Sequence, residues 1–372
     1  MKIVLLAPRS EIHTVRWANA LAERGHSVHI ISGHNNSGDA LCSDVYLHKI
    51  NIWSFIGYYT SIFKVRGILN EVAPDLFHAH YASGYGALGR LVGYHPYVLS
   101  VWGNDVYEFP YRSPLHRSIL RKNLCAADCL CSTSQAMADQ AYEATNVPSS
   151  KFYITPFGVK MSKFTLSKKS IFSTQEEIFI GTVKKLEKKY GIDLLLNSFA
   201  RLLNSLNDNK KLRSRLRLLI VGGGPDREKL ESLSETLGIR DVTSFAGKIS
   251  HEEVPTYLSK LDIFVALSRY ESFGVAVIEA SACGLPVVVS EVGGLPEVVK
   301  DRKTGLIVPD ESPKAAAEAI KSLLVNPSLS RKMGRLGRKH VKNNYSWSSS
   351  VSQMEYVYNS VLSSNNKSKQ KW

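Results

Sequence analysis

Two glutamates eight positions apart are the residues of this sequence whose types and spacing could do chemistry together. Glu271 falls in a loop after a predicted strand, and Glu279 lies two turns inside the predicted helix that follows. A loop carboxylate can accept hydrogen bonds from sugar hydroxyls, and a helical carboxylate can reach a ribose diol. Between them, Ser272, Phe273 and Gly274 place backbone N–H groups at a helix N-terminus, which favours an anion. The alternative is a surface glutamate and an unrelated glutamate on a helix face.

Residues 268–280 read Ser-Arg-Tyr-Glu-Ser-Phe-Gly-Val-Ala-Val-Ile-Glu-Ala. This segment resembles the Glu-x7-Glu motif of the family-4 retaining glycosyltransferases, also described as glycosyl transferases group 1. The resemblance implies an α/β fold of two doubly wound Rossmann-like domains facing a central cleft, called GT-B. It also implies that Glu271 is catalytic and contacts the donor sugar, while Glu279 contacts the nucleotide ribose. The diphosphate is then held by the backbone amides of Ser272, Phe273, Gly274 and Val275.

Two glycine-containing turns extend the resemblance. Residues 291–297, Glu-Val-Gly-Gly-Leu-Pro-Glu, resemble the family's turn before the donor-side helix, which assigns Gly294 and Glu297 to the donor site. Gly222 and Gly223 follow a predicted strand and are also assigned to that site. Glycines there let the backbone approach a ligand, although a glycine run is often only a tight turn.

A cluster of lysines follows the first predicted strand of the second half. Family members carry an Arg and a Lys here that neutralise the leaving diphosphate, whereas this sequence has Lys185 and Tyr190 at those positions. We expect Lys184 or Lys185, with Lys188 or Lys189, to supply the charge, because the chemistry requires only a cation near the diphosphate. Lys185 is assigned the catalytic role, and Lys184 and Lys189 the donor site. The alternative is a solvated lysine cluster.

The first half resembles the family's acceptor-side domain. His80 follows a predicted strand at 76–79 and matches the histidine beside the reacting sugar carbon, so it is assigned a catalytic role. His78 is instead expected as a packed strand residue. Asn104 and Asp105 belong to a Gly-x-Asp turn and are assigned to the acceptor side. Asp105 either contacts the acceptor or caps the next helix.

Two segments of the first half depart from the family pattern. The loop at 8–13 lacks the paired glycines that approach a phosphate. Arg9 and His13 are assigned to the acceptor side through their side chains, with a plain surface loop as the alternative. A Pro-Phe-Gly-Val turn resembles the one that closes on the donor sugar, which assigns Gly158 to the donor site. Phe157 stands where the family has Asn, so that side-chain contact is lost.

Apolar strand-like runs alternate with helix-like stretches along the chain, which indicates parallel sheets in two α/β cores. The alternation lapses at 160–174, where we place the linker. Strands are expected at 2–7, 27–31, 76–79, 97–101, 129–132, 152–154, 178–183, 216–221, 242–245, 263–266, 286–290 and 305–308. The predicted organisation is an acceptor-side domain at 1–165, a nucleotide-sugar-binding domain at 166–345, a helix at 346–362 that can pack back on the first domain, and a disordered basic tail at 363–372.

The composition is that of a basic, soluble protein. No apolar run approaches the ~20 residues that a membrane span needs. Five cysteines without a Cys-x-x-Cys motif disfavour a disulfide framework and indicate the cytoplasm. The net charge of +14 suits phosphate-bearing ligands or an anionic membrane, and nucleic acid is not an expected partner. The aromatic and basic stretch at 49–69 predicts peripheral contact with the inner membrane face, with a core helix as the alternative.

The expected reaction moves a sugar from a nucleotide diphosphate sugar to an acceptor hydroxyl with retention, in polysaccharide or lipid-linked glycan biosynthesis. No Asp-x-Asp motif occurs, so no metal ligand is assigned and neither an obligate metal nor another cofactor is expected. Two alternatives stand beside this reaction: a nucleotide-sugar 2-epimerase on a similar double fold, and a non-catalytic glycosyltransferase-like subunit. The Glu-x7-Glu segment and the glycine-rich turn argue against the epimerase.

Overall fold

The computed structural model describes residues 1–34, 40–52, 54–166 and 177–369. The chain forms two compact units, each with its own parallel β-sheet. We call Met1–Phe157 together with Trp347–Trp372 the first unit, and Gly158–Ser346 the second unit. Both sheets contain the strand order of a doubly wound Rossmann fold, and the predicted fold class is confirmed.

The change from the first unit to the second falls before 165, the boundary that the sequence suggested. Residues after Phe157 already bond to the second unit: the N–H of Val159 donates to the carbonyl of Tyr345 at 2.8 Å, and Arg338 donates to the carbonyl of Phe164 at 2.7 Å. Residues 158–164 therefore belong to the second unit, although their polar composition indicated a linker from 160 onward. Most of the predicted linker, 167–176, lies outside the described residues.

Seven strands form the sheet of the first unit, in the spatial order β3-β2-β1-β4-β5-β6-β7, and all neighbours are parallel. β4 and β5 are buried along their whole length because helices cover both faces of the sheet. The strands are β1 (Lys2–Leu6), β2 (Ser27–Ser32), β3 (Val45–Lys49), β4 (Leu76–His80), β5 (Tyr97–Val101), β6 (Cys129–Ser132) and β7 (Phe152–Ile154).

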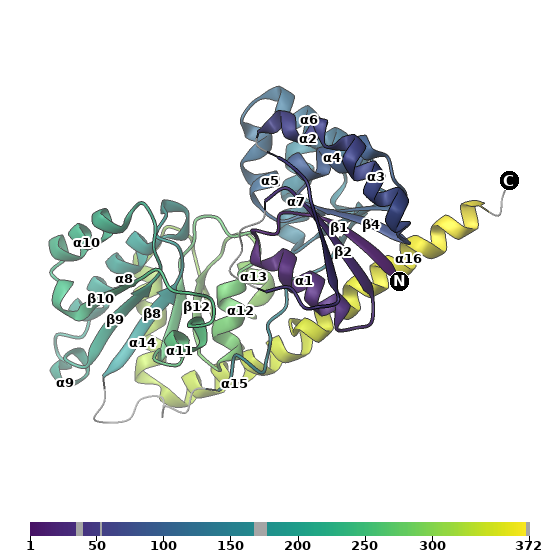
Figure 1. The fold of residues 1–372 in the computed structure, drawn as a ribbon. Helices are drawn as coiled ribbons and strands as arrows, with labels where there is room; N and C mark the ends of the chain where they lie inside the picture. Colours follow the sequence, from purple (N-terminus) through teal and green to yellow (C-terminus); the bar gives the residue numbers. More distant parts are fainter. Residues whose placement is uncertain (35–39, 53, 167–176, 370–372) are drawn as a thin grey trace. The chain divides into compact units, whose positions relative to one another are not determined.

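Figure 1 shows helices α1 and α16 on one side of strands β1, β2 and β4, and helices α3 and α4 on the other. The α-helices of this unit are α1 (Ile12–Ala22), α2 (Phe55–Thr60), α3 (Ile62–Val72), α4 (Gly84–Val92), α5 (Asn104–Tyr107), α6 (Pro114–Cys125), α7 (Gln135–Thr145) and α16 (Trp347–Lys369). The described residues of this unit also form the 3₁₀ turns η1 (Phe109–Tyr111) and η2 (Ser149–Lys151).

The C-terminal helix α16 packs on the first unit. The ring of Trp347 lies 5.0 Å from the ring of Trp17, and the His26 ring lies 3.0 Å from the Glu355 carboxylate. The helix continues to Lys369, which corrects the expected end at 362. Its later residues are polar but include no Gly or Pro, so nothing in them stops a helix that packing has already started.

Six strands form the sheet of the second unit, in the order β10-β9-β8-β11-β12-β13, again all parallel. The carboxyl ends of parallel strands share one edge, so the loops that follow them gather there. The strands are β8 (Ile178–Val183), β9 (Leu216–Val221), β10 (Thr243–Gly247), β11 (Ile263–Ala266), β12 (Val287–Ser290) and β13 (Leu306–Val308).

Helices α8, α10 and α14 bury their apolar faces against this sheet in one hydrophobic core. The helices of the second unit are α8 (Ile192–Asn204), α9 (Lys210–Arg213), α10 (Arg227–Thr236), α11 (Val254–Leu258), α12 (Val275–Ala282), α13 (Leu295–Val298), α14 (Pro313–Val325) and α15 (Pro327–Asn344), with 3₁₀ turns η3 (Lys188–Tyr190) and η4 (Arg240–Val242). In the part of the chain that the structure describes, no helix combines the length and the apolar character that crossing a membrane requires.

Candidate functional site

Glycines bring the loops at the carboxyl edge of the second sheet into contact. Val183 pairs with Val221, so Lys184 and Gly222 leave the sheet side by side. Gly222 has φ +145°, and a β-carbon on it would lie 1.8 Å from the carbonyl oxygen of Lys184. Any side chain at this position is therefore excluded. The predicted donor-site turn at Gly222 and Gly223 packs the β9 loop onto the β8 loop.

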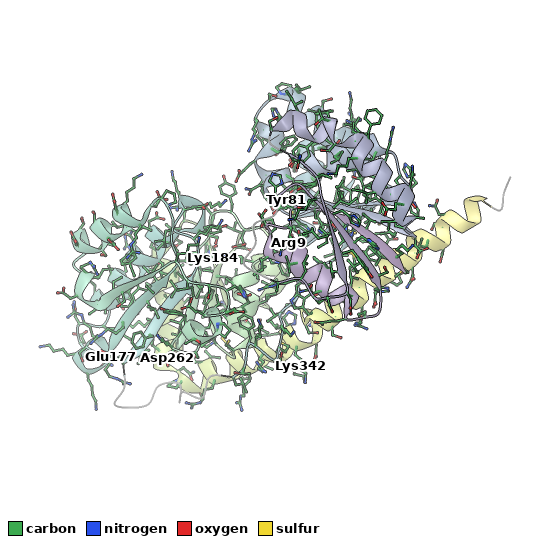
Figure 2. The ribbon with its side chains drawn as sticks, in the orientation of Figure 1. Arg9, Tyr81, Glu177, Lys184, Asp262 and Lys342 are labelled. Carbon is green, nitrogen blue, oxygen red and sulfur yellow. The ribbon has the colours of Figure 1, made fainter. Side chains whose placement is uncertain are left out.

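Lys184 and Glu271 form an ion pair at this edge. The Lys184 ammonium donates a hydrogen bond to Glu271 Oε2, and the two side chains are 8% and 10% exposed. The ammonium also lies 4.9 Å from the centre of the Tyr190 ring, within reach of a cation–π interaction. Figure 2 shows Lys184 at this edge of the sheet, with Glu177 and Asp262 at the opposite edge. Because desolvation offsets much of the attraction in a buried pair, stability alone does not explain its presence.

The loop that carries Glu271 is braced by the turn after β12. Gly293 has φ +51°, and a β-carbon on it would lie 1.9 Å from the carbonyl oxygen of Glu271. The N–H of Gly294 donates to that same oxygen at 3.0 Å. A β-carbon on Gly294 would lie 2.7 Å from the carbonyl oxygen of Ser272. Sequence reasoning assigned Gly294 to the donor site, and the structure places it directly against the Glu271 loop.

Among the predicted lysines, Lys184 is the one that reaches Glu271. Lys185 is exposed, because neighbouring residues at the end of a strand project to opposite sides. The structure therefore places Lys184, and not Lys185, against Glu271, whereas the sequence assigned the catalytic role to Lys185. Lys189 lies 3.2 Å from Glu187 and 5.4 Å from the centre of the Tyr190 ring.

Glu279, the second predicted carboxylate, is held by a residue that sequence reasoning missed. Its Oε1 atom lies 2.8 Å from Nε2 of His251, and the side chains of Glu279 and His251 are 7% and 26% exposed. His251 follows β10, so it stands at the same carboxyl edge as the other loops. The two residues are 28 positions apart. A search of all strand ends for polar residues could have found His251, whereas local spacing could not.

The predicted anion-binding amides lie at the start of α12. Gly274 is the N-terminal cap residue with φ +106°, and the helix begins at Val275. The first N–H groups of a helix have no intrahelical partner. Phe273 packs its ring 5.6 Å from that of Tyr345, whose hydroxyl donates to the carbonyl of Glu297 at 3.1 Å. Tyr345 thus connects Glu297 to Phe273, just before α12. Burial, and then the charge of Glu297, raises the pKa of Tyr345 to about 12.

In the first unit, His80 ends β4 inside an aromatic cluster. The residue is 1% exposed, and its ring lies 4.4 Å from the rings of both His78 and Trp102. Burial, and then His78, lowers the pKa of His80 well below its usual range, so the ring is neutral at pH 7. Within the described residues, His80 Nδ1, Thr14 Oγ1 and Thr133 Oγ1 are buried without a hydrogen-bond partner. Since buried polar atoms are normally bonded, these three atoms are candidate ligand contacts, and sequence reasoning missed both threonines.

Asp105 bonds to the chain itself but is not the helix cap that the alternative expected, because it lies in the first turn of α5 and the N-cap residue is Gly103. The carboxylate is 1% exposed and accepts backbone N–H groups from Ala82 at 2.8 Å, Gly103 at 2.8 Å and Trp102 at 3.1 Å. Burial raises the pKa of Asp105, and these amides partly oppose that rise. Asp105 therefore ties the loops after β4 and β5 together, while Asn104 beside it is exposed.

The first loop also belongs to the carboxyl edge of its sheet. The His13 ring stacks on the Phe157 ring with 3.8 Å between centres, so the loop is more than a plain surface segment. Figure 2 shows Arg9 and Tyr81 at this edge, after β1 and β4. Gly158 is the first residue of the second unit. Among residues 1–34, 40–52, 54–166 and 177–369, no group of three or more His, Cys, Asp or Glu is arranged to hold a metal ion.

The chain matches two models of glycosyltransferase families. Residues 2–134 match the model described as glycosyl transferase 4-like, and residues 163–340 match the model described as glycosyl transferases group 1. The D-inositol 3-phosphate glycosyltransferase of Corynebacterium jeikeium is 30% identical over 312 residues, which are 77% of this chain and 72% of that protein. The resemblance found in the motifs is thus confirmed along both halves of the chain.

Solved structures confirm the fold. Sucrose-phosphate synthase from Thermosynechococcus elongatus superposes with a TM-score of 0.81 at 22% identity, covering 98% of this chain and 100% of that one. HepE of Anabaena, solved with UDP and glucose, superposes with a TM-score of 0.78 at 16% identity, covering 97% and 100%. With its two Rossmann-like units of the GT-B fold, the chain belongs to the group 1 glycosyltransferases.

Proposed function

We propose that this glycosyltransferase takes its sugar from a nucleotide diphosphate sugar and transfers it to an acceptor hydroxyl with retention of configuration. The observation that carries the proposal is the buried Lys184–Glu271 pair beside the start of α12, with Glu279 about one turn inside that helix. A cation near a helix N-terminus suits a diphosphate, and the two carboxylates suit hydroxyl groups of a sugar and a ribose. HepE, which shares the fold, was solved with UDP and glucose.

In the proposed reaction, the bond between the anomeric carbon and the leaving phosphate oxygen breaks while the acceptor oxygen bonds to that carbon on the same face. The acceptor proton passes to the leaving diphosphate oxygen. The protein then contributes position and charge, without a covalent nucleophile. Lys184 stabilises the charge that develops on the diphosphate, and its burial strengthens that interaction.

Glu271 retains a carboxylate oxygen for the sugar in this arrangement. Lys184 and Ser268 both donate to Oε2, the latter at 3.4 Å, and no described residue donates to Oε1. We propose that Oε1 accepts a hydroxyl of the donor sugar. In the first unit, we propose that the neutral ring of His80 contacts the reacting sugar through Nδ1, the buried atom without a partner among the described residues.

A thermal-shift screen with UDP-, GDP- and ADP-sugars tests the donor class. A ligand present at a hundred times its Kd adds about 2.7 kcal/mol of stability, so the true donor should stand out. The anomeric configuration of the transfer product, read by NMR against that of the donor, then tests retention. Failure of every donor to stabilise the protein contradicts the donor class, and an inverted product contradicts retention.

The same assays distinguish the proposed function from the two alternatives. The comparisons give no support to a 2-epimerase, and incubation of the donor without acceptor should yield no epimer. A non-catalytic subunit should neither transfer nor hydrolyse a nucleotide sugar. We also propose that no metal or other cofactor is required, so that transfer continues at an undiminished rate in excess EDTA.

We propose that the acceptor belongs to a polysaccharide or lipid-linked glycan and that the enzyme works in the cytoplasm at the inner membrane face. The described part of the 49–69 stretch exposes Ile56, Tyr59 and Phe63, with exposed fractions of 69%, 37% and 81%, next to the exposed Lys64. Exposed apolar side chains beside a base suit an anionic bilayer surface. Trp53 lies outside the described residues. Flotation with anionic vesicles at low and high salt tests this contact, and no binding at low salt contradicts it.

A further inference from the structure

Arg269, two residues before Glu271, uses every N–H group of its guanidinium to join three loops of the second unit. A guanidinium has five N–H donors. Two donate to the Asp193 carboxylate at 2.8 and 2.7 Å, one to the carbonyl of Lys188 at 2.8 Å, and two to the Glu311 carboxylate. The Arg269 side chain is only 15% exposed. The loops after β8, β11 and β13 are thereby fixed to one planar group.

The backbone of the same segment is fixed at the same place. The N–H groups of Arg269 and Tyr270 both donate to the carbonyl of Lys189, at 2.8 and 3.3 Å. On the β12 side, Ser290 Oγ donates to the carbonyl of Ser268 at 2.7 Å. The segment that leads into Glu271 is therefore held on one side by the β8 loop and on the other by the end of β12.

The chemistry of this junction requires arginine. The hydrogen bond that Arg269 donates to Asp193, and then the one to Glu311, raises the pKa of Arg269 above its usual range, although partial burial opposes the rise. The paired bonds to Asp193 match the planar fork of a guanidinium. A lysine ammonium keeps the charge but has three donors on a single atom, so it cannot reproduce the fork or span three loops.

From these contacts we infer that Arg269 is a positioning residue that sets the Glu271 carboxylate against Lys184 and the donor sugar. This inference rests on the proposed function of Glu271. Arg269 itself is saturated by the chain, so it acts through the segment 268–271. A small displacement of a group beside a reacting carbon costs rate even when the substrate stays bound. The nucleotide is expected to depend instead on Glu279, inside α12.

The test compares Arg269→Lys with Arg227→Lys, a matched control. Arg227 bonds at 2.9 Å to Glu231, one turn later on the surface of α10. For Arg269→Lys we expect kcat of sugar transfer to fall about 10- to 100-fold. The Kd for UDP, or for the diphosphate of the donor that the screen identifies, should stay within about threefold. Amide hydrogen exchange at 268–271 should become faster. The control should change none of these quantities.

An unchanged kcat in Arg269→Lys overturns the inference. An equal loss of kcat and nucleotide affinity, together with a lower melting temperature, also overturns it, because that result indicates a purely structural role. If Arg269→Lys does not fold, Asp193→Asn, at a half-exposed position, takes its place. This variant must lower kcat by a smaller factor while the Kd for the nucleotide stays unchanged. A wild-type protein without transfer contradicts the proposed function instead. In that case, unchanged amide exchange at 268–271 in Arg269→Lys still overturns the positioning claim.

Discussion

At the residue scale, Glu271 and Glu279 have different surroundings, so substitutions at the two positions should have different effects. Glu271 sits in a loop braced by its neighbours and bonds to the Lys184 ammonium. Glu279 sits inside a helix and lies 2.8 Å from His251. A rigid helical carboxylate binds substrate and transition state alike, whereas a loop carboxylate beside the reacting carbon acts on the transition state.

We therefore expect Glu279→Gln to weaken nucleoside diphosphate binding about 10- to 100-fold, since hydrogen bonds to charged groups are worth about 1.5–3 kcal/mol. Glu271→Gln should leave that binding intact and lower kcat. Glutamine is chosen because alanine at 271 would leave a buried ammonium without its partner. Calorimetric binding beside steady-state transfer rates checks both, with Glu235→Gln, at an exposed position on α10, as control. Normal binding by Glu279→Gln, or normal transfer by Glu271→Gln, contradicts this division of roles.

A second residue-scale prediction concerns His80. Its neutral, buried ring should matter most as the sugar carbon becomes electron-poor, so His80→Ala should lower turnover more than it lowers donor affinity. Steady-state kinetics together with donor binding by calorimetry separate the two effects. A variant that keeps near-wild-type turnover shows that His80 only packs against Trp102 and His78.

Sequence reasoning found the residues that share a local motif and missed those that topology brings together. Glu271 and Glu279 are eight positions apart in one motif, and the structure places both beside the carboxyl edge of the second sheet. The partner of Glu279, His251, comes from a loop after a different strand. Sequence composition could not show which of Lys184 and Lys185 contacts Glu271. The answer depends on the side of the sheet to which each side chain projects where the strand ends.

At the element scale, the C-terminal helix reaches the interior of the first sheet. Tyr358 of α16 is 1% exposed, and its hydroxyl lies 2.7 Å from Nδ1 of His78 on β4. The other ring nitrogen of His78 lies 2.8 Å from Ser100 Oγ on β5. The His78 ring is then in edge contact with that of His80. A helix from the end of the chain thus supports the strand that carries a predicted catalytic residue.

Removing this hydroxyl should destabilise the first unit. Tyr358→Phe keeps the packed ring but leaves a buried nitrogen of His78 without its partner, which costs about 1–3 kcal/mol. Tyr356→Phe is the control, since Tyr356 is on the same helix and 64% exposed. Urea unfolding of the two variants checks the difference. Equal midpoints would show that the bond between the Tyr358 hydroxyl and His78 adds nothing to the stability of the first unit.

The regular elements of the second unit were predictable because their apolar patterns are long and bounded. The sequence predicted strands at 178–183 and 216–221, and the structure has β8 at Ile178–Val183 and β9 at Leu216–Val221. In the first unit, β3 was missed because it is a short edge strand with exposed Tyr46 and Lys49, and therefore lacks a continuous apolar run. Tertiary pairing with β2, and not local pattern, makes β3 a strand.

At the scale of the whole molecule, tryptophan is a reporter for one of the two units. The tryptophans that the structure describes, Trp17, Trp102 and Trp347, all belong to the first unit, so tryptophan fluorescence follows its unfolding. Urea unfolding followed by fluorescence and by circular dichroism should therefore give different transitions if the units unfold independently, and a two-state treatment of the whole chain would then fail.

Tryptophan fluorescence also tests whether acid lowers the free energy of unfolding of the first unit, as the buried His78 and His80 predict. Burial lowers the pKa of His78 from 6.5 to about 3, and it lowers that of His80 well below 6.5. Below pH 6.5 the unfolded chain therefore binds these protons and the folded unit does not, so the free energy of unfolding falls as pH falls. The slope is about 1.4 kcal/mol per pH unit for each histidine, and it vanishes above the unfolded pKa.

Urea unfolding followed by tryptophan fluorescence at pH 7.5, 6.5 and 5.5 measures this loss, with pH values chosen around the unfolded pKa. Asp105 acts in the opposite direction, because burial raises its pKa and the folded unit binds that proton first. The variant His80→Leu isolates one histidine: it removes a buried nitrogen that has no partner among the described residues and replaces the ring with an apolar side chain. It should reduce the slope below pH 6.5 by about 1.4 kcal/mol per pH unit while changing stability little at pH 7.5. Equal slopes for wild type and variant would mean that His80 binds its proton as readily in the folded unit as in the unfolded chain.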